Sequence, residues 1–65
     1  MVRPEVNYDE AANAAYIRFS SEDVADSSEV SPGIVFDYDG SGKIVGMELL
    51  DAKKQLPASL LAHAA

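Results

Sequence analysis

The sequence contains no cysteine and no tryptophan, and it has a single histidine among its 65 residues. Without cysteine the chain forms no disulfide, and a closed zinc site of the Cys/His type cannot be assembled within one chain. The histidine, His63, lies close to the C-terminus, where chains fray, so we expect no catalytic role for it. We therefore expect neither a structural metal nor a cofactor.

Basic residues are also scarce, because 5 Lys and Arg stand against 11 Asp and Glu, for a formal charge of −6. Lys and Arg must neutralise phosphates in nucleic-acid binding, so nucleic acid is not an expected partner. The acidity favours a basic protein as a possible partner instead. The sequence has no apolar run of 18 residues, and Arg3, Pro4 and Glu5 interrupt any signal-like stretch. We expect a cytoplasmic protein that does not enter the membrane.

The length predicts one small domain spanning residues 1–65. A chain near 60 residues buries only about 60% of the surface that its unfolded form exposes, and such chains often need disulfides, a metal or a second subunit. With the first two excluded, association with another chain is the remaining route to stability. We expect a homo-oligomer, most simply a dimer, or a complex with another small protein.

Alternating apolar and polar residues predict antiparallel strands over residues 2–8, 14–20, 24–30, 34–38 and 43–50. Pro4 favours either an edge position or a late start for the first strand. Asp9 is expected to cap a single turn over residues 10–13. The third strand is the most polar, and we expect it to be an exposed edge strand whose Asp26 and Glu29 discourage edge-to-edge aggregation.

The strongest local signal is a hairpin in which residues 39–42 join the last two strands. Gly40 and Gly42 supply the positive φ angles that a tight connection needs. The register that we predict pairs Tyr38 with Lys43, Phe36 with Val45, and Ile34 with Met47. It gathers five apolar side chains on one face, namely Ile34, Phe36, Val45, Met47 and Leu49. We expect this face to form the core.

After Asp51 the apolar spacing becomes helical, which predicts a short helix over residues 53–65 with Pro57 in its first turn. This helix could cover one face of its own sheet or dock onto a second chain. The expected fold class is α+β, a small antiparallel β-meander of four to five strands followed by a short C-terminal helix.

Four polar side chains are predicted to lie on the face opposite the core: Tyr16, Arg18, Asp37 and Glu48. If their strands are neighbours, Arg18 could pair with Asp37 or Glu48. One interpretation is a surface ion pair worth about 0–1 kcal/mol. The other is a binding site for a small ligand or for a cation of a partner, which requires the apolar residues of that face to be covered.

Asp37, Asp39 and Asp51 raise the possibility of a calcium or magnesium site, since hard cations prefer carboxylate oxygens. Residues 37–42 resemble the opening of a calcium loop, with Glu48 at the twelfth position. A tight hairpin between two paired strands cannot also curl round an ion, so we expect turn residues here and no metal. The sequence contains no nucleophile elbow, cysteine nucleophile or phosphate-binding loop, and we expect no enzymatic activity.

The runs 7–19, 30–39 and 42–52 resemble the small prokaryotic proteins of the "domain of unknown function 2283" family. That family has, roughly, Tyr-Asp-x-x-x-Asp-Ala-x-Tyr-Ile, then Gly-Val-x-x-Asp-Tyr-Asp, then Gly-x-x-x-Gly-Ile-Glu-Ile-Leu-Asp-Ala. Asn13 stands where the family usually has Asp, and Met47 replaces Ile. The resemblance implies a compact, mostly antiparallel domain without a defined activity. Some relatives look like genomic neighbours of small toxin-like proteins, which implies an antitoxin-type role.

The leading hypothesis is therefore a non-enzymatic protein-interaction module, which either associates with itself or binds a small, basic partner in the manner of an antitoxin. The alternative is a protein that binds a small ligand or cation through Arg18, Asp37 and Glu48.

Overall fold

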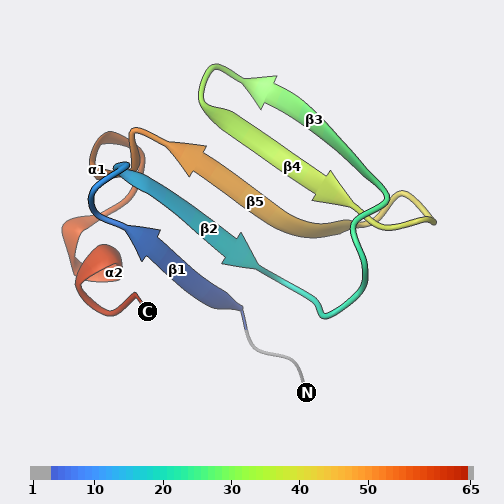
Figure 1. Ribbon diagram of the computed structural model, residues 1–65, viewed down its shortest axis with the longest axis horizontal. Coiled ribbons are helices and arrows are strands. Elements are labelled where there is room, and N and C mark those ends of the chain that lie inside the picture. The colour runs from blue at the N-terminus through green and yellow to red at the C-terminus, as the bar shows by residue number, and fades with distance from the viewer. Residues whose placement is uncertain (1–3, 65) are drawn as a thin grey trace.

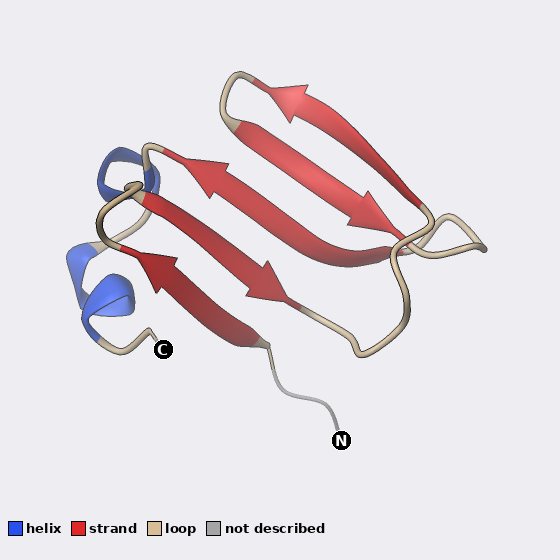
Figure 2. Ribbon diagram, viewed as in Figure 1, coloured by secondary structure: helices blue, strands red, loops and turns tan. Residues whose placement is uncertain are grey.

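The computed structural model describes residues 4–64 and consists of one five-stranded antiparallel sheet followed by two short helices (Figures 1 and 2). The strands are β1 (Glu5–Asp9), β2 (Ala14–Arg18), β3 (Asp26–Ser31), β4 (Ile34–Tyr38) and β5 (Ile44–Leu50). The helices are α1 (Ala52–Gln55) and α2 (Ala58–Ala62). The predicted α+β class is confirmed. Val2 and Arg3 of the first predicted strand, and Ala65 of the predicted helix, lie outside the described residues.

The strands are arranged in the order β1-β2-β5-β4-β3, so the predicted meander order is wrong (Figure 1). The physical reason is the burial pattern of the strands. In β2, Ala15 and Ile17 are buried and pair with Leu49 and Met47 of β5. The polar β3 is exposed along its whole length and forms an edge. The edge positions expected for β1 and β3 are confirmed.

The hairpin between β4 and β5 forms as predicted, but its predicted register is wrong by one residue at Tyr38 and by two residues beyond the bulge. Lys43 belongs to the loop, because its carbonyl oxygen accepts a hydrogen bond from the amide of Asp39 at 2.9 Å. The first cross-strand pair is Tyr38 with Ile44, a bulge follows, and Phe36 pairs with Met47. A shift of two residues preserves the side-chain faces, so the predicted apolar set still shares one face.

Only one of the two glycines of this loop supplies a positive φ angle. Gly42 has φ +83°, whereas Gly40 is not among the residues with positive φ. The amide of Gly42 donates to the carbonyl oxygen of Asp39 at 3.0 Å and closes the turn. The turn therefore depends on a single left-handed position.

The predicted single helix is also wrong, because Pro57 divides it into α1 and α2. A residue that precedes proline is driven out of the helical region, and Leu56 is extended, with φ −124° and ψ 149°. Pro57 precedes the first turn of α2 instead of standing inside a longer helix. Among residues 4–64, no helix has the length and hydropathy needed to cross a membrane.

Both helices lie beyond one end of the sheet and do not extend over its middle (Figure 1). The molecule is correspondingly thin, with principal extents of 33, 29 and 17 Å. The buried apolar residues are Ala15, Ile17, Val45, Leu49 and Ala52. Among the described residues the largest fully buried side chain is that of Val45. The core is thus a small strip along one side of a single-layered sheet.

Candidate functional site

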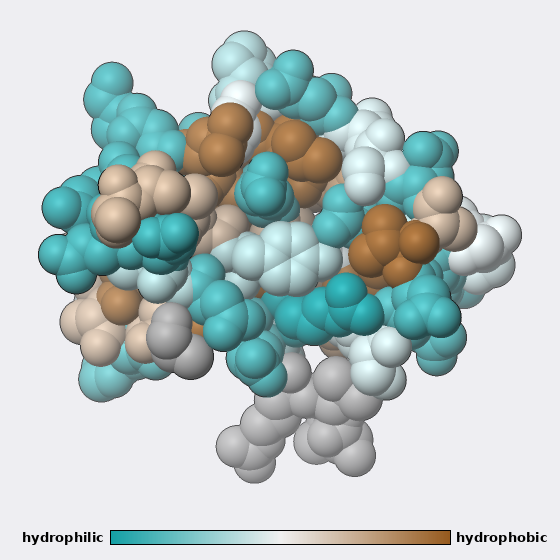
Figure 3. Space-filling view, viewed as in Figure 1, coloured by the Kyte–Doolittle hydropathy of each residue, from teal (hydrophilic) through white to brown (hydrophobic). Residues whose placement is uncertain are grey.

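The sheet has two faces of different character, which follow from the pairing of its strands. The polar face carries five carboxylates and one guanidinium, from Glu5, Asp9, Glu29, Asp37, Glu48 and Arg18. Val35 and Leu50 lie among them, and Leu50 is 46% exposed. Figure 3 shows how hydrophobic patches alternate with hydrophilic ones on one face of the molecule. The polar face is acidic and is not covered by either helix.

Tyr16 and Asp37 meet across the middle strand of this face. The hydroxyl of Tyr16 donates to Oδ2 of Asp37 at 2.7 Å, and the hydroxyl of Ser27 donates to Oδ1 of Asp37 at 2.6 Å. Gly46 of β5 lies between the two strands and pairs with Asp37. Burial, followed by the hydrogen bond to Asp37, raises the pKa of the Tyr16 hydroxyl above its ordinary value. The phenol therefore stays protonated and acts as a hydrogen-bond donor.

Arg18 is directed to backbone oxygens. Its guanidinium donates to the carbonyl oxygens of Ser20 and Glu22 and thereby holds the start of the connection between β2 and β3. Glu48 is exposed, and its Cα pairs with those of Tyr16 and Val35. The structure thus brings Tyr16 and Asp37 together, while Arg18 makes neither of the two pairings that the sequence suggested.

The carboxylate of Asp39 organises the β4–β5 loop. Its Oδ1 accepts the amides of Ser41 and Lys43 and the hydroxyl of Ser41, at 2.9, 3.0 and 2.8 Å. The hydrogen bond from the Lys43 amide, followed by that from Ser41, lowers the pKa of the Asp39 carboxyl. The expectation that Asp39 is a turn residue is confirmed. Residues 4–64 contain no group of three or more His, Asp and Glu side chains that could hold a metal ion.

Asn13 connects the β1–β2 turn to the junction of β5 and α1. Its side-chain amide donates to Oδ1 of Asp51 at 3.0 Å, and its Oδ1 accepts the amide of Lys53 at 3.1 Å. Its carbonyl oxygen accepts the amide of Ala52 at 2.9 Å. Asn13 and Asp51 both have positive φ angles, of 50° and 55°. The sequence pattern gives no sign of this junction, because Asn13 and Asp51 lie 38 residues apart in the chain.

The other side of the sheet, the apolar face, carries two rows of side chains that run from strand to strand. One row consists of Tyr8, Ala15, Leu49, Ile34 and Ser31, and the other of Val6, Ile17, Met47, Phe36 and Ser28. None of these side chains is charged. Ala15, Ile17 and Leu49 are buried, whereas the larger Phe36, Met47 and Tyr8 are only half-buried. The apolar face thus keeps large side chains in contact with solvent.

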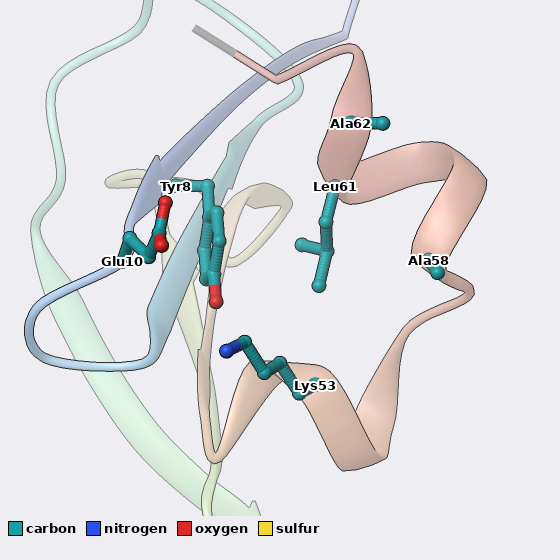
Figure 4. Close-up of a pocket in the computed structure, with 6 residues that line it drawn as sticks. All are labelled: Tyr8, Glu10, Lys53, Ala58, Leu61 and Ala62. Atoms are coloured by element: carbon teal, nitrogen blue, oxygen red, sulfur yellow. The ribbon is translucent and has the colours of Figure 1, made fainter.

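The helices cover only one corner of the apolar face, and they leave an open groove there of about 580 Å³ (Figure 4). Tyr8 faces Leu61 of α2 across this groove, and the amino group of Lys53 points toward the end of the Tyr8 side chain that bears the hydroxyl. Ala58 and Ala62 complete the helical wall, and Glu10 lies on the strand side. Of the two predicted positions for the C-terminal segment, partial cover of its own sheet is the one observed, and Pro57 limits that cover because it divides the segment into two short helices.

Comparison with known proteins identifies the family. A family model described as "Protein of unknown function (DUF2283)" matches residues 5–53. The chain therefore belongs to this family, and the resemblance seen in the sequence is confirmed. The matched region contains all five strands and the Asn13 junction, but it ends within α1. No curated protein and no solved structure matches the chain.

Proposed function

We propose that the chain is a non-enzymatic protein-interaction module. The observation that carries this proposal is the single-layered sheet, whose polar face and most of whose apolar face are left uncovered by the rest of the described chain. Stable domains are built from at least two packed layers, because a sheet must bury its apolar face against another element. A partner chain supplies the missing layer.

The chemistry of the described side chains supports binding in preference to catalysis. No polar or charged side chain among residues 4–64 is buried. Catalytic groups acquire shifted pKa values by burial and by close charged neighbours in a sheltered pocket. The hydroxyl of Tyr16 and the carboxylate of Asp37 are hydrogen-bonded to each other, which suits a structural contact in an interface.

The acidic polar face favours a basic protein as the second kind of partner. Five carboxylates against one arginine attract a cationic surface and speed its encounter, and salt would weaken that attraction. An antitoxin-type role would use this face. Binding of a small ligand through Arg18, Asp37 and Glu48 is the weaker proposal, because a ligand would have to displace the hydrogen bonds that Arg18 and Asp37 already make.

The test is capture of partners by the immobilised chain from a lysate of the source cells, followed by reconstitution of each candidate complex from purified proteins. Glu48→Lys reverses one charge of the polar face, and Asp23→Lys, which makes the same change of charge at an exposed position between β2 and β3, is the matched control outside the sheet. A basic partner should bind Glu48→Lys more weakly and the control equally well. If no purified protein binds the chain and the chain does not associate with itself, the interaction proposal fails.

A further inference from the structure

We propose that the apolar face binds a second copy of this chain, so that two sheets pack face to face. This inference rests on the proposed interaction function and names the occupant of one face. The dimer would be isologous, with the same patch contributed by both copies. Aligned packing of two sheets places them about 10 Å apart, with the side chains of both inner faces interdigitating.

The helices of the described chain are too short to be the missing layer. Five strands about 4.8 Å apart, each about five residues of about 3.3 Å long, outline a face of about 24 by 17 Å. A helix rises about 1.5 Å per residue, so α1 and α2 span only about 6 and 8 Å. They are also displaced to one end of the sheet (Figure 1).

The area of the apolar face comes close to what a dimer needs. The flat outline amounts to about 400 Å² on each copy, or about 800 Å² for both. Accessible surface follows the relief of half-buried side chains such as Phe36 and Met47, and therefore exceeds the flat outline. The total approaches the roughly 1,000 Å² that a specific interface needs.

The distribution of charge allows a second copy as the occupant. The chain carries a net charge of −6, so two copies repel each other unless their carboxylates point away from the contact. The two rows of the apolar face contain no charged side chain, and the carboxylates of the sheet lie mostly on the polar face. Asp26, opposite Tyr38 at the edge, is the exception. Two polar faces pressed together would oppose five carboxylates to five.

The side chains of the apolar face alternate in size, as interdigitation requires. Ala15 pairs with Tyr8 on one side and Leu49 on the other, so a small side chain lies between larger ones. In the next row Phe36 and Met47 pair directly and stand at the centre of the sheet.

The first test is the mass of the purified chain by sedimentation equilibrium, from about 1 µM to about 1 mM, a range that covers weak and tight dimers. Phe36→Lys places a charge in the contact, and Val35→Lys puts the same residue one position away on the opposite face, between Glu29 and Glu48. We expect dimers of the original chain and of Val35→Lys. Phe36→Lys should raise the dissociation constant at least about 100-fold.

A second test does not depend on a disruptive variant. The chain has no cysteine, so Met47→Cys and Glu48→Cys each introduce a single thiol, on opposite faces of β5. With a chromogenic disulfide reagent, Cys at position 47 should react slowly at high protein concentration and faster on dilution. The thiol at position 48 should react at a rate that is independent of protein concentration.

The outcomes separate this inference from the proposed function. A chain that is monomeric at every concentration, with a thiol at position 47 that always reacts quickly, overturns the second-copy proposal. If that thiol is then protected by a different purified protein, the interaction function still stands. If no protein protects it and none binds the polar face, both proposals fail. Equal dimerisation of Phe36→Lys and Val35→Lys would also overturn the inference, because the contact would then lie elsewhere.

Discussion

The ring of Tyr16 occupies the space that any side chain at position 46 would need. A Cβ atom built on Gly46 would lie 2.1 Å from the hydroxyl oxygen of Tyr16 and 2.7 Å from its Cζ atom. Because Gly46 has no side chain, Tyr16 can reach across β5 to Asp37. The hydroxyl of Tyr16 donates a hydrogen bond to Oδ2 of Asp37 at 2.7 Å. Because Gly46 does not have a positive φ angle, the requirement for glycine is one of space alone.

The first prediction follows from this contact. Gly46→Ala should lower the free energy of unfolding by about 1–3 kcal/mol, since Tyr16 must be displaced from its place. In the background of Tyr16→Ala, the same substitution should have little effect. Urea unfolding of the two single variants and the double variant gives the coupling between positions 16 and 46. Additive effects would show that the ring of Tyr16 does not restrict the size of the residue at position 46.

The second prediction concerns alkaline pH. The folded pKa of Tyr16 lies above its ordinary value of 10.0, so the folded state holds this proton more tightly than the unfolded state. This contribution to stability is complete below pH 10.0 and is lost as pH rises through the folded pKa. Absorbance of tyrosinate should show a late step that Tyr16→Phe removes. Asp37→Asn should bring that step to lower pH, and an unchanged step would refute the role of Asp37.

The third prediction concerns acid. Hydrogen bonds lower the folded pKa of Asp39 below its ordinary value of 3.8, so its contribution to stability is present above that pH and is lost as the pH falls through the folded pKa. Asn at position 39 can still accept the amides of Ser41 and Lys43 but does not titrate. Asp39→Asn should therefore reduce the loss of stability measured by urea unfolding between about pH 4 and about pH 2. A variant with an unaltered acid profile would contradict the prediction.

The fourth prediction concerns the junction at Asn13. Asn13→Ala removes three side-chain hydrogen bonds, with Tyr8, Asp51 and Lys53, and leaves a residue without a hydrogen-bonding side chain in the left-handed region, so it should lower the free energy of unfolding by about 2–4 kcal/mol. Asn13→Gly loses the same hydrogen bonds but tolerates φ 50°, and should cost about 1–2 kcal/mol less than the alanine variant. Thermal and urea unfolding measure both. Equal losses would show that backbone conformation is not limiting at this position.

Local patterns in the sequence predict local structure well in this chain. Alternation gave the correct faces for Phe36 and Met47, and the carboxylate of Asp39 marked the turn between their strands. The predicted register of the β4–β5 hairpin is wrong because Lys43 belongs to the loop and a bulge follows it. Neither feature can be seen in the alternation of apolar and polar residues. The predicted order of the strands is wrong because β2 pairs with β5, a strand that is distant from it in the chain.

The candidate site was predicted in part, for a similar reason. The period of two residues placed Tyr16 and Asp37 on one face, and they form a hydrogen bond there. The same period gave no indication that Gly46 leaves room for the ring, or that Arg18 turns back to the carbonyl oxygens of Ser20 and Glu22. Such contacts depend on three-dimensional neighbours that spacing alone does not reveal.

The order of the strands divides the sheet into an N-terminal pair and a C-terminal trio that meet along one seam, the β2–β5 ladder. Hydrogen bonds of Asn13 hold the two parts together at one end of this seam. At the other end the carbonyl oxygen of Val45 accepts the amides of Phe19 and Ser20. Residues 21–24 lie outside both groups of hydrogen bonds and are exposed. Cleaving it would leave two fragments whose joining surface is intact, which makes this chain a natural starting point for a split reporter that regains its shape when the halves meet.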